Sequence, residues 1–338
     1  MPSRHRRDLA APRHRQLALV VLGAGAAVIT AIPLLSGLAS ASPHASARTS
    51  VAATTLRTAT HHHHRHHRHH RHHRRHRVPT RFGASVHAAG LPWSRAVARS
   101  DSWYHHLRMI RVFYPGLPEQ WPGRAGDVHR PVAVSFDVQP SIVLSGKYDA
   151  YFTHWFRTAP KAHRTWWTYI HEPEDDIERG RFTASSYRAA WRHLHTLSVK
   201  ATHNPKLRPT LTLMCYTLSP YSHRQFSDYN PGPWIHTYAW DCYNRDASAG
   251  QYVTPHKMFQ YVLPFTRHHH KEFGVAEFGS RIAAGRPASS RAQWLRRSAR
   301  YLRHHHAAYV SYFDSTVGDD YRLLDAPSRA AWRAIVNR

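Results

Sequence analysis

The chain has 338 residues, of which 42% are hydrophobic and 11 are tryptophan, so it is long and apolar enough for one large folded domain. Its net charge of +27 would suit a polyanionic partner, but the excess is uneven. The first 79 residues hold 13 Lys and Arg against one acid, and the rest hold 34 against 19. No zinc finger, RNP-like motif or heptad basic region is present, which argues against a nucleic-acid-binding protein.

Residues 1–41 are typical of a targeting segment. Five arginines precede an apolar run from Leu17 to Leu38, and the small residues Ala39-Ser40-Ala41 follow it. The run exceeds the ~7–15 residues of a usual signal-peptide core and reaches the ~20 that cross a bilayer. A cleaved signal peptide and an uncleaved membrane anchor both stay open. Either one predicts a secreted protein or one anchored to the membrane and facing outside.

Residues 42–79 form a polar segment that is almost wholly His and Arg from His61 to Arg77. Such a composition cannot bury a core, so we predict a disordered linker. It would act as a solvated spacer or attract acidic cell-surface polymers through its charge. Metal capture by the histidines is less favoured, because a disordered tract has no fixed coordination geometry.

Residues 80–338 alternate short apolar or aromatic runs with longer amphipathic ones, which indicates repeated βα units around a parallel sheet. Eight such repeats in about 260 residues are typical of a (β/α)₈ TIM barrel, which places this domain in the α/β class. The expected strands are Phe82–Val86, Met109–Tyr114, Val132–Asp137, Trp166–His171, Thr210–Cys215, Tyr238–Tyr243, Gly274–Glu277 and Tyr309–Phe313.

The clearest helical patterns lie between these strands and at the carboxyl end. Thr183 and Ser289 occupy expected N-cap positions, and Pro327 suits a first helical turn. The expected helices are Tyr148–Phe156, Ala184–Leu197, Lys257–Phe265, Ala292–His305 and Pro327–Val336.

Two of the six glutamates, Glu172 and Glu277, stand at the carboxyl ends of the fourth and seventh expected strands, where a TIM barrel carries its chemistry. Glutamate is a poor strand former, and burying it costs desolvation unless something compensates. Retaining glycoside hydrolysis needs two carboxyl groups about 5–5.5 Å apart, one protonated and one ionised. The pair therefore predicts that chemistry, and paired structural carboxylates bonded to arginine are the alternative.

Four further residues are expected near this pair. The side chains of Asp241 and Tyr243 are expected on the same face of the sixth strand, because side chains alternate with period 2 along a strand. The Tyr243 phenol could donate a hydrogen bond to Glu277, and Arg111 on the second strand could add positive charge beneath it. His171 precedes Glu172 and would contribute to its environment or serve as an ordinary hydrogen-bonded barrel residue.

These motifs resemble clan A glycoside hydrolases, and most of all family 26, the β-mannanase family. The resemblance covers the chain from about Phe82 onward and rests on His171-Glu172, on Asp241-x-Tyr243-Asn244 and on Glu277-Phe278-Gly279. It implies that Glu172 is the acid/base, Glu277 the nucleophile and Tyr243 the hydrogen-bond partner of the nucleophile. The family usually has Met or Phe and then Asn after His-Glu, whereas Pro173-Glu174 follows here, a departure that bears on sugar preference.

Aromatic and acidic residues near the strand ends complete the expected site. Two or three of Trp93, Tyr114, Trp121, Tyr216 and Trp234 should line a sugar-binding cleft, since Trp and Tyr offer an apolar face and a polar edge. The run from Glu174 to Asp176 is expected to be a solvated loop or a helix-capping cluster. We expect no cofactor and no metal ion.

The two cysteines and the overall function each keep alternatives. Cys215 and Cys242 would lie on neighbouring strands and could form a disulfide, and an unpaired core role is equally compatible with their spacing. The leading interpretation is an endo-acting β-glycanase. A catalytically silent glycan-binding barrel tethered at the cell surface is the main alternative, and a basic surface-adhesion protein is a third.

Overall fold

The computed structural model describes residues 79–87 and 90–338. The expected segments 1–41 and 42–79, apart from Pro79, lie outside the described residues, so both stay predictions. Within the described part, no helix is long and apolar enough to cross a membrane.

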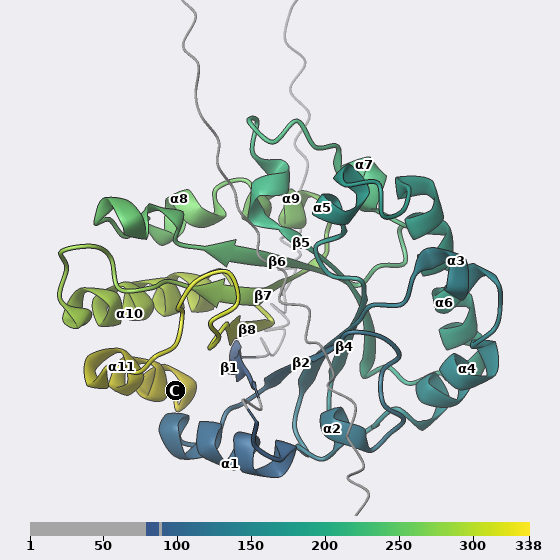
Figure 1. Cartoon of the computed structure of the whole chain (residues 1–338), viewed down its shortest axis with the longest axis horizontal. Helices are drawn as coiled ribbons and strands as arrows, with labels where there is room; N and C mark the ends of the chain where they lie inside the picture. Colours follow the sequence, from purple (N-terminus) through teal and green to yellow (C-terminus); the bar gives the residue numbers. More distant parts are fainter. Residues whose placement is uncertain (1–78, 88–89) are drawn as a thin grey trace, which may run out of the picture. The chain divides into compact units, whose positions relative to one another are not determined.

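Eight parallel strands form a closed barrel in which each strand pairs with the next along the chain and β8 pairs with β1, as the sequence predicts (Figure 1). β5 begins three residues earlier and β4 ends two residues earlier than expected. The strands are β1 Arg81–Ser85, β2 Ile110–Tyr114, β3 Val132–Phe136, β4 Thr165–Tyr169, β5 Leu207–Met214, β6 Thr237–Tyr243, β7 Glu272–Gly279 and β8 Tyr309–Tyr312.

Helices surround the barrel (Figure 1). They are α1 Trp93–Tyr104, α2 Gly123–Gly126, α3 Pro140–Leu144, α4 Asp149–Thr158, α5 Pro173–Glu178, α6 Ala184–Ala201, α7 Phe226–Tyr229, α8 Pro255–Phe259, α9 Val262–His268, α10 Ala288–His304 and α11 Ala326–Val336, with short 3₁₀ segments η1 Cys215–Leu218 and η2 Arg245–Ala249.

The helix boundaries confirm some predictions and correct others. The Thr183 side chain caps α6 by accepting a hydrogen bond from the Ser186 amide. Ser289, in contrast, lies inside α10, which already begins after Pro287. The single helix expected over 257–265 is two helices, α8 and α9. Pro264 explains the break, because it has no amide to bond the carbonyl of residue 260 and its ring would clash with that carbonyl.

The floor of the barrel is packed with apolar and aromatic side chains. Trp166 of β4 and Tyr309 of β8 are both fully buried, with ring centroids 4.4 Å apart. Gly274 of β7 makes room for this packing, since a Cβ there would come within 2.8 Å of the Tyr309 ring. The floor is therefore a packed core, as in other TIM barrels.

Candidate active site

A cavity of about 700 Å³ opens at the carboxyl ends of the strands. Both Glu172 and Glu277 line it, as do His171 and Tyr243. The rest of the lining is mostly apolar and aromatic and consists of Val86, His87, Trp93, Val112, Phe113, Arg124, Phe313, Val317, Gly318 and Tyr321. The barrel thus brings the two predicted catalytic residues into one hollow.

The backbone leaves β4 through two left-handed residues before it reaches the cavity. The strand ends at Tyr169, and Ile170 and Glu172 have φ values of 45° and 48°. A left-handed conformation is strained for a β-branched residue such as Ile170, at a cost of about 1–3 kcal/mol. The Ile170 amide bonds the Phe136 carbonyl at 2.9 Å, and the Glu172 amide bonds the Thr212 carbonyl at 3.1 Å. The neighbouring strands β3 and β5 therefore hold Glu172 in an unusual turn that directs it to the cavity.

Glu277 reaches the same cavity because β7 contains a bulge. The pairing of β6 with β7 shifts by one residue just before Asp241, which lies opposite Glu277. The extra residue is Ala276, whose side chain belongs to the barrel interior. In a regular strand Glu277 would then point outward. The bulge turns Glu277 to the cavity, while Phe278 faces the helices and stacks on Trp294 at 4.6 Å.

Three carboxylates converge at this point. One oxygen each from Glu172, Asp241 and Glu277 lie within 4.8 Å of one another. Asp241 is only 4% exposed, and neither of its carboxylate oxygens has a hydrogen-bond partner among the described residues. This approach of Glu172 to Glu277 is compatible with the short spacing of the two carboxyl groups in retaining glycosidases.

The two glutamates have different electrostatic surroundings. Burial raises the pKa of Glu172 well above its usual range, and the negative charges of Glu277 and Glu174 raise it further. Burial also raises the pKa of Glu277, but the Arg111 guanidinium and a hydrogen bond from the Tyr243 hydroxyl oppose that rise. The Arg111 Nη2 lies 3.9 Å from the Glu277 carboxylate. Glu277 is therefore the member of the pair that ionises first, and Glu172 keeps its proton to higher pH.

His171 is neutral in this environment. Burial and the nearby Arg111 charge lower the pKa of His171 to about 3. Its ring lies 5.3 Å from the Phe113 ring, with which it forms one wall of the cavity. A neutral imidazole there can exchange hydrogen bonds with a ligand without adding charge beside Glu172.

Four of the five aromatic residues named as sugar-binding candidates do not line the cavity, so the expectation that two or three would do so is wrong. Tyr114 is 4% exposed, and the Arg124 guanidinium lies over its ring at 4.5 Å, so Arg124 occupies the position expected for a ligand. Trp234 stacks on His195 of α6 with ring centroids 3.9 Å apart, on the outer side of the barrel. Trp93 does line the cavity, and it alone of the five candidates does so.

The sequence interpretation missed several cavity residues that lie in loops. Phe313 directly follows β8, and Tyr321 stands in the loop after it, where its ring packs on Tyr243 at 4.7 Å. His87 follows β1 and contacts Phe313 edge to face at 5.6 Å. Position after a strand could have identified His87 and Phe313, whereas no sequence pattern places Tyr321.

The carboxylate triad of Glu172, Asp241 and Glu277 is the cluster in the described part of the chain whose geometry could hold a cation. Oxygen ligands of this kind suit Ca²⁺ or Mg²⁺. The Arg111 guanidinium beside Glu277 already supplies positive charge to this cluster, which opposes such binding. The arrangement is better suited to proton transfer and nucleophilic attack.

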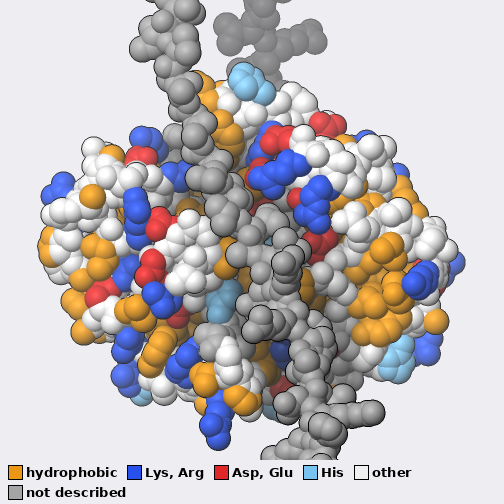
Figure 2. Space-filling model, in the orientation of Figure 1, with side chains coloured by type: hydrophobic (Ala, Val, Ile, Leu, Met, Phe, Trp, Pro, Cys, Tyr) orange, Lys and Arg blue, Asp and Glu red, His pale blue; other side chains and the backbone are white. Residues whose placement is uncertain are grey.

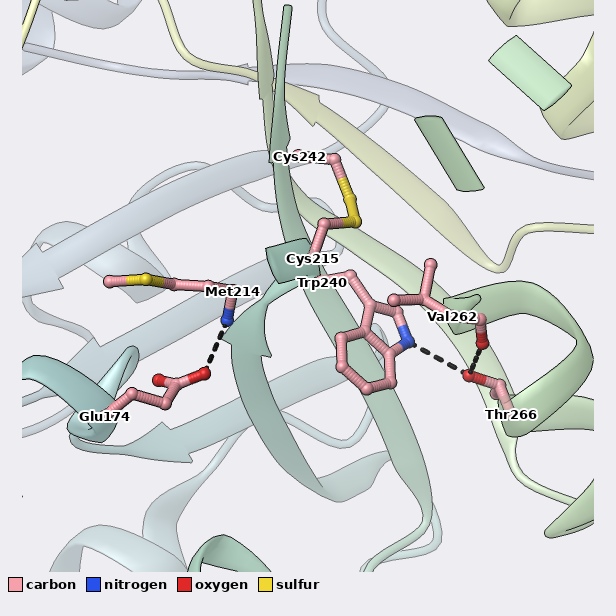
Figure 3. Close-up of a disulfide and its surroundings, with 7 residues drawn as sticks. All are labelled: Glu174, Met214, Cys215, Trp240, Cys242, Val262 and Thr266. Atoms are coloured by element: carbon pink, nitrogen blue, oxygen red, sulfur yellow. Dashed lines mark hydrogen bonds between the residues drawn. A yellow bond between two sulfur atoms is a disulfide. The ribbon is translucent and has the colours of Figure 1, made fainter. Parts of the chain in front are cut away.

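Cys215 and Cys242 form a disulfide, which settles the alternative that the sequence left open (Figure 3). Their Cα atoms are 5.2 Å apart. The bond joins the segment after β5 to Cys242 of β6. The neighbours of Cys242 in that strand, Asp241 and Tyr243, point their side chains the other way, into the barrel. The disulfide therefore fastens the strand that supplies two residues of the site.

Charged side chains of both signs lie close together on the face of the molecule shown in Figure 2. Many of the arginines have acidic partners. Arg124 bonds Glu119 at 2.7 Å, and Arg224 bonds both Asp175 and Glu178 at 2.7 and 2.6 Å. Much of the basic charge of the barrel is thus locally compensated.

Comparison with known proteins identifies the fold. No protein-family model matches the chain. No curated protein matches it either. Among solved structures, a glucosidase from Croceicoccus marinus is 12% identical with a TM-score of 0.50, over 77% of this chain and 67% of that one. A hyperthermostable endo-1,4-β-D-mannanase from Thermotoga petrophila RKU-1 is 9% identical with a TM-score of 0.50, over 76% and 99%.

The fold and the site together define the class of protein. The chain is a (β/α)₈-barrel protein with two glutamates facing each other at the carboxyl ends of β4 and β7. It shares its barrel with glycoside hydrolases such as the two named above. Membership of family 26 stays a prediction from the motifs.

Proposed function

We propose that the chain is a retaining glycoside hydrolase that cleaves a β-linked polysaccharide, mannan or a related β-glycan. Glu277 is the nucleophile and Glu172 the acid/base. The observation that supports this most directly is the approach of the two carboxylates to within 4.8 Å in an open cavity. Their unequal surroundings add to it, because one group must be ionised while the other is protonated.

The reaction follows from these roles. The ionised Glu277 attacks the anomeric carbon, and the protonated Glu172 donates its proton to the departing glycosidic oxygen. Glu172 then takes a proton from a water molecule, which attacks the glycosyl–Glu277 ester and releases the sugar with its original configuration. Tyr243 and Arg111 stabilise the Glu277 carboxylate when it is free.

The cavity walls favour a carbohydrate as the ligand. Trp93 offers a ring on which a pyranose can stack, and its indole nitrogen bonds the Arg124 carbonyl at 3.0 Å, which fixes the ring. His171 and the carboxylates supply polar partners for sugar hydroxyls. The resemblance to family 26 adds mannan as the first substrate to test.

The site of action follows from the amino-terminal sequence. We infer that residues 1–41 direct export and that the chain works outside the membrane, either released or anchored. The basic segment 42–79 would then bring it to acidic cell-surface polymers through electrostatic attraction. Cell fractionation of the full chain and of a variant that lacks residues 1–41 tests export. We expect the truncated form to stay inside the cell.

The stereochemistry of the products tests the mechanism. The full chain is incubated with β-mannan, xylan, mixed-linkage β-glucan and bacterial wall glycans, and the new reducing ends are followed by ¹H NMR. We expect a β-anomer as the first product from one of them. An α-anomer would overturn the retaining mechanism. Saturable glycan binding without any hydrolysis would identify a glycan-binding barrel instead.

Replacing Tyr243 by phenylalanine tests how the nucleophile is kept ionised. The change removes a hydrogen bond to the carboxylate, so the pKa of Glu277 rises and the acid limb of the kcat/KM profile moves to higher pH. We expect kcat/KM to fall roughly 10–100-fold at mildly acidic pH, as for the loss of one hydrogen bond to a charged group. Tyr261→Phe, at an exposed position, is the matched control. An acid limb that stays in place would show that Tyr243 does not act on Glu277.

A further inference from the structure

Glu174 lies two residues after Glu172, in the acidic run for which the sequence predicts a solvated loop or a helix-capping cluster, and it is fully buried. It occupies the first turn of α5, next to Asp175 and Asp176, which are only partly buried. Burying a carboxylate is costly unless specific partners compensate. The partners of Glu174 therefore indicate what it does.

One oxygen of Glu174 fastens α5 to the end of β5. Its Oε1 accepts a hydrogen bond from the Met214 amide at 2.8 Å (Figure 3). It accepts another from the Thr217 hydroxyl in η1. The chain segment that carries Glu172 is thus bonded to β5 at two points, because the Glu172 amide also bonds the Thr212 carbonyl of that strand. The other oxygen, Oε2, is buried without a hydrogen-bond partner among the described residues.

The anchoring point is itself rigid. Met214 directly precedes Cys215, whose disulfide to Cys242 reaches β6 (Figure 3). Cys242 stands between Asp241 and Tyr243. A short covalent and hydrogen-bonded path therefore connects the segment that carries Glu172 to the strand whose tyrosine bonds Glu277.

Among the residues that the structure describes, none forms a direct ion pair with Glu174. Arg224 attracts it from a distance but forms its ion pairs with Asp175 and Glu178. The other groups that interact with it electrostatically are Tyr187 of α6, Tyr229 of α7, Asp241 of β6 and Glu172.

This environment makes the charge of Glu174 sensitive to pH. Burial raises the pKa of Glu174 to about 7, although the bonds from Thr217 and the Met214 amide oppose the rise. Its negative charge raises the pKa of Glu172 in turn, after burial and the charge of Glu277. Glu174 thus gains its charge as the pH approaches the range in which an acid/base would begin to lose its proton.

We infer that Glu174 is a positioning residue: it ties the segment that carries Glu172 to the end of β5 and places a buried carboxyl group two residues from the acid/base. The inference rests on the proposed function for the role of Glu172 as acid/base. The contacts that support it involve Glu174, Met214 and Thr217 and stand apart from the substrate cavity.

Two substitutions separate the two effects. Glu174→Gln keeps a carbonyl oxygen for the Met214 amide and the Thr217 hydroxyl and removes the charge. Glu174→Ala removes both. Glu178→Gln is the matched control, because it removes an exposed charge from the same helix.

Carbon-13 labelling of glutamate gives a measurement that does not need catalysis, since the full chain has only six glutamates, at positions 119, 172, 174, 178, 272 and 277. NMR titration of the labelled side-chain carboxyls, assigned from single Glu→Gln variants, gives the midpoint of Glu172. In the Glu174→Gln variant, we expect the titration midpoint of Glu172 to fall by roughly half a pH unit or more, as for removal of a nearby like charge. In the Glu178→Gln variant, the Glu172 midpoint should stay within about 0.2 pH units of its value in the parent, because an exposed charge is screened by solvent.

Activity on the substrate identified above gives the second measurement. In Glu174→Gln the alkaline limb of kcat/KM should move to lower pH, while kcat on the acid side stays within about threefold of the parent. In Glu174→Ala we expect kcat to fall about tenfold or more at every pH, as for a displaced catalytic group. A Glu172 midpoint unchanged by Glu174→Gln overturns the inference, even if Glu174→Ala fails to fold. If the parent hydrolyses nothing, the proposed function fails, and the NMR titration still decides the effect of Glu174.

Discussion

Replacing Glu277 by alanine is expected to lower kcat on the preferred glycan by on the order of 10³–10⁵-fold. The covalent step needs a carboxylate at this position, and Asp241, its neighbour across β6 and β7, is deeply buried without lining the cavity. Asp241 therefore cannot replace Glu277. Initial rates and circular dichroism of the parent and the variant, measured side by side, separate loss of chemistry from loss of fold.

Replacing Glu172 by alanine should have a smaller effect that depends on the substrate. With a polysaccharide, whose leaving group needs a proton, we expect a loss of about 10²–10⁴-fold. With an activated aryl glycoside, the first step needs no such help, so the glycosyl–enzyme should form and accumulate. A burst of aryl alcohol equal to the enzyme concentration is the expected signal. Equal losses on both substrates would contradict the assignment of Glu172.

Added azide distinguishes the two roles by configuration. In the Glu172→Ala variant, azide attacks the glycosyl–Glu277 ester and gives a β-glycosyl azide. In the Glu277→Ala variant, azide takes the place of the missing nucleophile, while Glu172 still protonates the leaving group, and gives an α-glycosyl azide. The opposite pattern would exchange the two assignments, and NMR of the isolated azides reads the outcome directly.

The barrel and its paired glutamates were predictable from the sequence, because the strands recur as apolar runs and the two glutamates directly follow two of those runs. Eight apolar runs at regular spacing count the strands, and a carboxylate directly after an apolar run stands out where glutamate is otherwise rare. The tyrosine partner followed from the period of a strand, since Asp241 and Tyr243 share a face. Each of these inferences needs only local order along the chain.

The features that escaped prediction depend on tertiary structure. The bulge at Ala276 reverses the side on which Glu277 would lie, and only pairing with β6 reveals it. Glu174 appears in a run of acids that resembles a solvent-exposed loop, yet the end of β5 buries it. Trp234 stacks on His195 because α6 passes nearby, which no distance along the sequence indicates.

Removing the disulfide by the double substitution Cys215→Ala and Cys242→Ala is expected to lower the free energy of unfolding by about 3–4 kcal/mol. The bond closes a loop with a sequence separation of 27, and its loss restores conformational freedom to the unfolded chain. Urea denaturation followed by tryptophan fluorescence measures the change. A melting temperature lower by roughly 10 °C should accompany it.

The same bond should matter for the site as well as for stability. Cys242 lies between Asp241 and Tyr243, and Cys215 follows Met214, whose amide bonds Glu174. Loss of the disulfide should therefore loosen the segments that support both Glu172 and Glu277. We therefore expect the double variant to lose activity on warming well before it unfolds. Reducing agent should reproduce this in the parent and change nothing in the double variant. A variant that keeps both the stability and the temperature profile of the parent would show that hydrogen bonds alone hold β5 and β6 together at the cavity.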